Sequence, residues 1–158
     1  MSAAVHEFFR KPVDGAGAEQ LLATLGTNSY PSDWSSDGKW IVFRQDGDKT
    51  GQDLWLLPLS GDRKPVPYLA TPAAEYQARF SPDGRWMAYT SNESGQPQVY
   101  VQAIPASGPK WQISQAGGSS PYWRHDGKEM FYLSADQKVM AVPVKIGTSV
   151  EPETPQEL

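Results

Sequence analysis

The sequence of 158 residues has no cysteine and only two histidines. The absence of cysteine excludes disulfide bonds, thiolate nucleophiles and zinc sites built on cysteine, but it leaves reducing and oxidising compartments equally open. Basic residues are also few, because 14 Lys and Arg stand against 18 Asp and Glu, for a net charge of −4. With no basic surface to attract a phosphate backbone, we expect no nucleic-acid partner.

Long apolar runs are absent as well. No run in the sequence approaches the roughly 20 residues of a membrane-spanning helix, and residues 1–5 lack the charged start and apolar core of a secretion signal. We therefore expect a soluble chain with no membrane span. What the sequence has instead is short apolar stretches separated by 14 Gly and 14 Pro. This composition is typical of short strands joined by turns, so helix should be scarce.

A ten-residue pattern occurs three times. It consists of an aromatic residue, a tight turn containing Asp-Gly, a basic residue and an apolar strand, at residues 34–43, 80–89 and 123–132. Its aspartates, Asp37, Asp83 and Asp126, stand 46 and then 43 residues apart. That period is typical of four-stranded propeller blades. The sequence therefore predicts an all-β fold, a partial β-propeller of antiparallel four-stranded blades, with about three to three and a half blades.

The repeat also predicts where the blades begin and end. Residues 1–24 match the second half of a blade, because the segment around Phe8 falls 46 residues before the segment around Leu54. Residues 25–72 and 73–116 form two full blades, and residues 117–144 form an incomplete third blade. Residues 145–158 are poor in apolar side chains and hold two prolines. We expect them to be a frayed polar tail, with a fourth strand either absent or barely begun at residues 156–158.

Two aromatic positions recur in every copy and predict the packing between blades. One lies three residues before the turn aspartate and the other six residues after it; the residues are Trp34, Phe80 and Trp123, and Phe43, Tyr89 and Tyr132. Large flat side chains at both places are expected to be buried between stacked sheets. A third position lies three residues after the turn aspartate. The first two copies have Trp40 and Trp86 there, and the third copy has Glu129. This exchange indicates that no further blade covers the outer face of the third one.

Two segments resemble chemical sites without completing them. Residues 46–51 match the opening of a calcium loop, but Leu57 stands where the bidentate glutamate is needed, so an ordinary hairpin loop is favoured. His125 lies beside Asp126, yet it occupies a turn position held by Ser36 and Pro82 in the other copies, and no nucleophile elbow accompanies it. We expect no catalytic residue, no metal and no cofactor, and hence no enzymatic activity.

The candidate binding residues are those that vary at regular positions. Four residues before the turn aspartate stand Asp33, Arg79 and Tyr122, which strand alternation places opposite the packed aromatics. Varied side chains at such a position are typical of a ligand-facing channel wall, although unpacked residues facing solvent would look the same. Tyr30 and Tyr76 are expected to contribute to the same mouth.

The Phe-Ser-Pro-Asp-Gly segment at residues 80–84, together with residues 110–114, 123–129 and 140–144, resembles the repeats of TolB-like propellers. Within that group the chain is most similar to the C-terminal propellers of bacterial serine/threonine kinases and related regulators. The resemblance implies a six-bladed ring, a protein or peptide partner at the channel mouth and a periplasmic or extracytoplasmic location. No kinase motif occurs in the sequence itself.

Two classes of function follow from these observations. The first is a non-enzymatic protein-interaction or ligand-sensing propeller, part of a larger TolB-like or kinase-linked protein. The alternative is a fragment of the substrate-gating propeller of a prolyl-oligopeptidase-like serine peptidase. Two chains could also close a six-bladed ring as a homodimer, if residues 121–133 of one chain paired with residues 8–23 of the other. The rival to that dimer is a fragment of a longer propeller.

Overall fold

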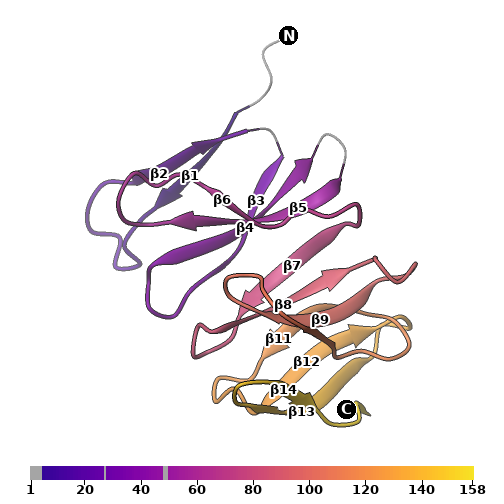
Figure 1. The fold of residues 1–158 in the computed structure, drawn as a ribbon. Helices are drawn as coiled ribbons and strands as arrows, with labels where there is room; N and C mark the ends of the chain where they lie inside the picture. The colour runs from indigo at the N-terminus through magenta and orange to yellow at the C-terminus, as the bar shows by residue number, and fades with distance from the viewer. Residues whose placement is uncertain (1–4, 27, 48–49) are drawn as a thin grey trace.

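The computed structural model describes residues 5–26, 28–47 and 50–158. All regular structure in these residues is β-strand, which confirms the predicted all-β class. In Figure 1 the sheets follow one another down the molecule, from the indigo N-terminal hairpin to the yellow C-terminal blade. Within the described ranges no helix has the length and apolar character needed to cross a membrane.

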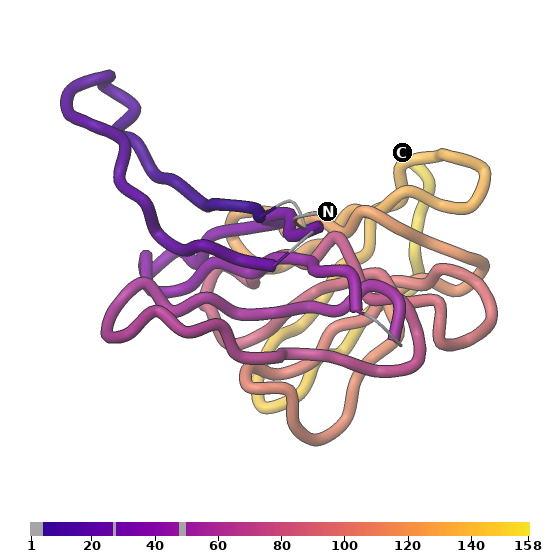
Figure 2. The backbone as a smooth tube through the Cα atoms, turned by 90° about the horizontal axis from the view of Figure 1, so that it is seen from above, coloured from indigo at the N-terminus to yellow at the C-terminus, as the bar shows by residue number. Residues whose placement is uncertain are grey.

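The chain begins with half a blade, as the repeat predicts. Strands β1 (His6–Arg10) and β2 (Gln20–Leu25) form a two-stranded antiparallel sheet, with a bulge between Phe8 and Phe9. Phe8, Leu22 and Leu25 are buried against the first full blade. Figure 2 shows the far end of this hairpin extending away from the rest of the molecule.

Two complete four-stranded blades follow, each antiparallel and in sequence order. Blade 1 consists of β3 (Ser29–Trp34), β4 (Trp40–Gly47), β5 (Gly51–Pro58) and β6 (Val66–Leu69). Blade 2 consists of β7 (Glu75–Phe80), β8 (Trp86–Ser91), β9 (Gln98–Ala103) and β10 (Lys110–Gln112). Pro58 ends a strand and Pro67 lies in the edge strand β6, where a missing ladder donor costs little.

Blade 3 is more complete than the sequence predicts. Its strands are β11 (Gly118–Trp123), β12 (Glu129–Ser134), β13 (Val139–Ile146), β14 (Val150–Pro152) and β15 (Gln156–Glu157). Strand β14 pairs with the end of β13 and β15 with its beginning, so two short strands together fill the outer position. The expectation of a frayed tail is therefore wrong. Backbone pairing with β13 and burial of Val150 hold this segment without an alternating apolar pattern.

The repeated turn has the role that its residues predict. In blade 2, Ser81 Oγ accepts a hydrogen bond from the Trp86 amide at 3.0 Å and donates to Asp83 at 2.6 Å, while Gly84 adopts a φ of +70°. In blade 3, Arg124 replaces the serine and binds Asp126 through two nitrogens, at 2.9 and 2.8 Å. These contacts, with the Lys128 amide, lower the pKa of Asp126 to about 2. The turn is thus structural in every copy.

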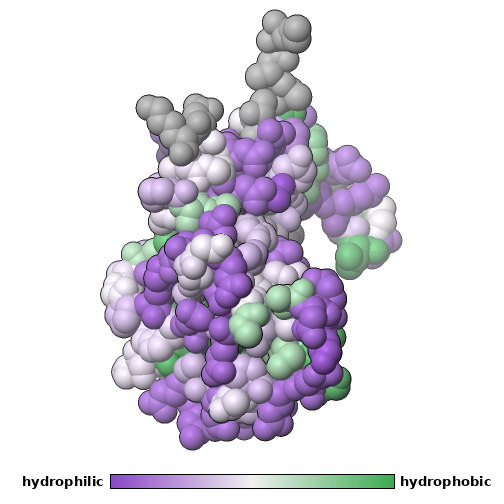
Figure 3. All heavy atoms as spheres, turned by 90° about the vertical axis from the view of Figure 1, so that its right-hand side faces the viewer, coloured by the Kyte–Doolittle hydropathy of each residue, from purple (hydrophilic) through white to green (hydrophobic). Residues whose placement is uncertain are grey.

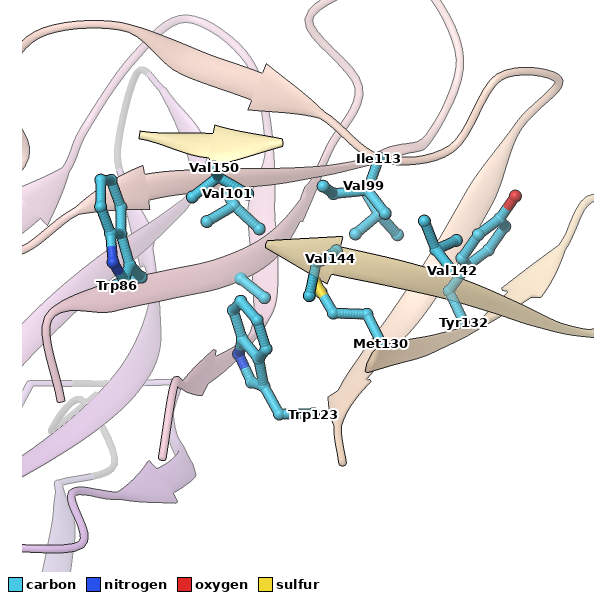
Figure 4. Packing of buried hydrophobic residues seen from close by; sticks show 11 residues of the cluster. Trp86, Val99, Val101, Ile113, Trp123, Met130, Tyr132, Val142, Val144 and Val150 are labelled. Atoms are coloured by element: carbon cyan, nitrogen blue, oxygen red, sulfur yellow. The ribbon is translucent and has the colours of Figure 1, made fainter. Parts of the chain in front are cut away.

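Apolar clusters lie between successive sheets rather than within them. The cluster between blades 2 and 3 joins Trp86, Val99 and Val101 on one side to Trp123, Met130 and Val142 on the other (Figure 4). Phe43, Tyr89 and Tyr132 are all buried, which confirms the prediction for that aromatic position. Because each sheet has a packed partner on at least one face, a blade gains its stability from its neighbours.

Trp34 departs from the predicted packing. Its repeat equivalents Phe80 and Trp123 are 8% and 7% exposed, whereas Trp34 is 45% exposed. The equivalent aromatics pack on the inner strands of the preceding blade. The half-blade before Trp34 consists only of the outer strands β1 and β2, so the described residues provide no inner strands to cover the indole.

The pairing in blade 3 also bears on the homodimer hypothesis. In that hypothesis the outer edge of β12 accepts the half-blade of a second chain. In the structure this edge is already paired with β13, from Glu129 with Pro143 to Leu133 with Val139. A mixed blade would therefore require β13 to be displaced from β12.

Candidate functional site

Three of the five predicted binding residues meet in one hollow. The hollow has a volume of about 430 Å³ and lies where β3, β7 and β11 run into the turns that follow them. These strands are neighbours at the inner side of the array. The residues of interest in its lining are Asp33, Trp34, Arg79, Tyr122 and His125. We call this hollow the mouth.

Asp33 connects two blades. Its Oδ1 accepts a hydrogen bond from the Trp34 amide, and its Oδ2 accepts one from the Phe80 amide of the next blade, both at 2.9 Å. Since both carboxylate oxygens are engaged with backbone amides, Asp33 holds β3 against β7. Its role at the mouth is to shape the wall.

Arg79 brings a positive charge to the mouth. Its guanidinium donates a hydrogen bond to the Ser32 carbonyl and lies over the Tyr122 ring, 5.4 Å from the ring centroid. A carbonyl and an aromatic face orient the guanidinium without neutralising its charge. The charge therefore remains available to an acidic group of a ligand.

Two exposed aromatic side chains flank this cation. Tyr122 is 61% exposed and Trp34 is 45% exposed, and His125 lies exposed in the turn beyond β11. Tyrosine, tryptophan and arginine are the residue types that most often dominate binding energy at protein interfaces. The mouth can thus hold an aromatic or acidic side chain of a ligand.

Tyr30 and Tyr76 do not contribute to the mouth, contrary to expectation. Tyr30 lies near the opposite end of β3, where its ring meets His6 edge-on and carries the Arg44 guanidinium at 4.6 Å. Tyr76 lines a different hollow, with Gln77 and Gln137. Residues near the start and the end of an inner strand open onto opposite faces of a propeller, so sharing a strand does not bring them together.

The sequence reasoning missed Trp34 as a mouth residue because it assigned all three repeat aromatics to packing. The signal was nevertheless present. The same sequence predicts that the half-blade before blade 1 lacks its inner strands, and an aromatic residue that faces those missing strands is left uncovered. His125 was correctly interpreted as a turn residue, and it also reaches the mouth.

The calcium-like segment forms the hairpin between β4 and β5, where Gly47 pairs with Gly51. Asp48 and Lys49 of this segment lie outside the described residues. Thr50 donates a hydrogen bond to Asp53 at 2.8 Å. Among the residues that the structure describes, no group of three or more His, Asp or Glu could hold a metal ion.

Glu75 is a buried carboxyl away from the mouth, and it makes stability depend on pH. Thr71 donates to its Oε1, while Oε2 is buried without a partner. Burial raises the pKa of Glu75 above its ordinary value of 4.5. The unfolded chain thus releases this proton at a lower pH than the folded chain, and stability is lost as pH rises from about 4.5 through the folded pKa.

Replacing Glu75 with glutamine should therefore raise the free energy of unfolding at pH 7 by about 1 kcal/mol and flatten its pH dependence above pH 5. Urea denaturation between pH 4 and pH 8 measures both effects. Glu7→Gln, at an exposed position of β1, is the matched control and should leave the pH profile unchanged. A wild-type profile in Glu75→Gln would contradict the prediction.

No protein-family model matches the chain. Among solved structures, TolB from Acinetobacter baumannii is similar with a TM-score of 0.66 and 22% identity, over 92% of this chain and 37% of that one. A protein described as putative TolB from Agrobacterium tumefaciens is similar with a TM-score of 0.65 and 22% identity, over 98% of this chain and 62% of that one. The chain thus spans less than two thirds of either structure. Its four-stranded antiparallel blades and these similarities together show that it has the TolB-like β-propeller fold.

Proposed function

We propose that this chain is a non-enzymatic interaction module that binds a protein or peptide partner at the mouth. The observation that carries the proposal is the group formed by Arg79 and the exposed aromatic rings of Trp34 and Tyr122. Large exposed aromatics next to an oriented cation are favourable anchors for a partner side chain.

The size of the mouth favours a polypeptide ligand that contacts the protein over a small area. A hollow of about 430 Å³ is large enough to accept one or two side chains. On the face shown in Figure 3, apolar surface forms small areas separated by polar residues, so that face offers no broad apolar interface. A short segment that anchors an aromatic or acidic residue in the mouth fits the size of this hollow.

The location of the module and the larger protein that contains it are part of the same proposal. The extracytoplasmic location and the link to a serine/threonine kinase stay predictions from sequence resemblance, because the two structures compared above are described as TolB and putative TolB. No observation on the described residues favours the peptidase-gating alternative. A reading frame that joins these repeats to an α/β-hydrolase domain would favour it instead.

A displayed library of random peptides selected against the protein tests the proposal. The dissociation constants of selected peptides, measured by fluorescence anisotropy, should rise at least about 10-fold in Tyr122→Ala. The matched control is Tyr30→Ala, since Tyr30 is also an exposed inner-strand tyrosine but lies away from the mouth. Selected peptides that bind both variants as tightly as the wild type, or that lose affinity equally for both, would contradict the proposal.

A further inference from the structure

A second hollow lies on the face of the array opposite the mouth. It has a volume of about 460 Å³, and it is bounded by the starts of β7 and β11 and by the β8–β9 and β12–β13 hairpins. Its lining residues all belong to blade 2, to blade 3 or to the link between them. The half-blade therefore has no part in the shape of this second hollow.

Gln137 lines the second hollow in a backbone conformation that glycine adopts more easily. Residues 134–137 form a turn like the Asp-Gly turn at residues 81–84, because in each turn the first serine donates a hydrogen bond to the aspartate at 2.6 Å. The last residue of the Asp-Gly turn is Gly84, with a φ of +70°, and its counterpart is Gln137, with a φ of +65°. A side chain disfavours this conformation. Glycine would thus suit the turn better, but it would bring no carboxamide to the hollow.

Gln77 also has a positive φ, of +55°, and it joins the two blades. It lies in the bulge of β7, where its Oε1 accepts hydrogen bonds from the Thr90 hydroxyl at 3.0 Å and from the Ser120 amide at 2.8 Å. Ser120 is the equivalent residue of β11, 43 positions later, and its φ is +55° as well. Blade 1 has Pro31 at this position, and proline cannot adopt a positive φ. The repeat therefore does not require this strained conformation, which is typical of ligand sites.

The second hollow is polar but uncharged. Among the described residues that line it none is charged, and the polar groups come from Tyr76, Gln77, Gln96, Ser119, Ser134 and Gln137. In the two bounding hairpins the charged residues have partners of their own. Glu93 pairs with Lys110. Lys138 pairs with Asp136 at 3.6 Å and with Glu157 at 2.8 Å. A charged ligand would thus lose hydration without gaining a free counter-charge.

The groups in the lining match a ligand that carries many hydroxyl groups. A carboxamide offers a donor and an acceptor side by side, which neighbouring hydroxyls of a sugar can satisfy together. The ring of Tyr76 is partly buried and provides apolar surface for the C–H face of a sugar. A peptide backbone matches less well, because peptides add to sheets through free strand amides. The amides of Gly118 and Ser120 already donate to the Pro97 carbonyl and to Gln77.

We propose that the second hollow is a binding site for a neutral saccharide. The carboxamides of Gln77, Gln96 and Gln137 bind its hydroxyl groups, and Tyr76 packs against its ring. A volume of about 460 Å³ lies in the range of small-ligand sites. The site is distinct from the mouth, because Tyr76 lies near the start of an inner strand and the mouth lies at the ends of these strands. A saccharide in the second hollow does not compete with a peptide at the mouth.

Titration of the ¹⁵N-labelled protein followed by NMR tests this site. The probes are glucose, N-acetylglucosamine, maltose and cellobiose, each added up to about 50 mM, because a few hydrogen bonds of this kind give millimolar dissociation constants. At least one of these sugars should cause saturable shifts in the side-chain NH₂ signals of Gln77, Gln96 and Gln137. The backbone signal of Tyr122 should stay in place. Shifts that do not saturate with any of the four sugars, or that arise only elsewhere, would overturn the proposal.

Gln137→Gly separates binding from folding. Because glycine suits the positive φ, the midpoint of urea denaturation should be equal to or above that of the wild type, while the dissociation constant of the saccharide should rise at least about fivefold. Arg63→Gly is the matched control, since Arg63 also has a positive φ, of +50°, but lies between β5 and β6. An unchanged dissociation constant in Gln137→Gly, or an equal rise in both variants, would refute the proposal.

Two further arms identify the ligand and the face. The neutral peptide N-acetyl-trialanine amide should leave the three glutamine signals unshifted, and if it shifts them as the sugars do, the second hollow is a peptide site and the proposal is wrong. Tyr122→Ala should bind the saccharide as the wild type does. Failure of peptide binding at the mouth and failure of saccharide binding here are therefore separate results.

Discussion

Replacing Trp123 with alanine is expected to lower the free energy of unfolding by about 3–5 kcal/mol, whereas Trp34→Ala should cost less than about 1 kcal/mol. The two residues occupy the same repeat position, but Trp123 is 7% exposed and Trp34 is 45% exposed. Trp123 packs into the cluster between blades 2 and 3, and its indole nitrogen donates to the Arg79 carbonyl at 3.4 Å. Its removal leaves a cavity in the apolar cluster that joins blades 2 and 3.

Urea denaturation followed by circular dichroism measures both costs. Trp123→Phe is the conservative control and should lose less than Trp123→Ala, because the ring still fills most of the space. Equal costs at Trp34 and Trp123 would contradict the prediction and would mean that Trp34 is covered in solution.

Phe8→Ala is expected to detach the half-blade while the three blades remain folded. Phe8 is 7% exposed, and its ring meets Phe43 of blade 1 edge-on, with centroids 5.5 Å apart. Loss of a buried phenylalanine costs about 3–5 kcal/mol, which is more than a two-stranded hairpin can supply from its own pairing. Because each unit of a repeat array contacts only its neighbours, the loss stays local.

Amide hydrogen exchange tests this prediction residue by residue. Amides of residues 6–25 should lose their protection in Phe8→Ala, and those of β8, β9 and β12 should keep theirs. The neighbouring variant Phe9→Ala is the matched control, since Phe9 is 51% exposed and should leave exchange as in the wild type. Uniform loss of protection through all blades would show that the half-blade is required for the whole fold.

Much of the fold could be predicted because the repeat carries its own structural rules. The Asp-Gly turns, the alternation along the strands and the aromatics at Phe43, Tyr89 and Tyr132 depend on interactions within one blade or with an adjacent copy, and the structure confirms them. The last strands of blade 3 could not be predicted in the same way. Strands β14 and β15 are held mainly by backbone pairing with β13, which leaves little pattern in the side chains.

The candidate site was predictable only in part. Strand alternation correctly grouped Asp33, Arg79 and Tyr122, because equivalent positions on neighbouring inner strands lie side by side. It could not show that both oxygens of Asp33 bind backbone amides or that Arg79 lies over Tyr122, since these contacts join different blades. It also placed Tyr30 and Tyr76 at the wrong end of the strands.

The sequence by itself determined that this protein is an array of antiparallel blades with one half-blade at its start, because turn chemistry, strand alternation and a period of about 45 residues are written into every copy. Only the tertiary structure decided which equivalent residues are buried and which are free to bind. Burial depends on what lies across from a side chain, and at Trp34 the half-blade provides no inner hairpin. One repeat position therefore supplies a core residue in blades 2 and 3 and an exposed aromatic at the mouth in blade 1.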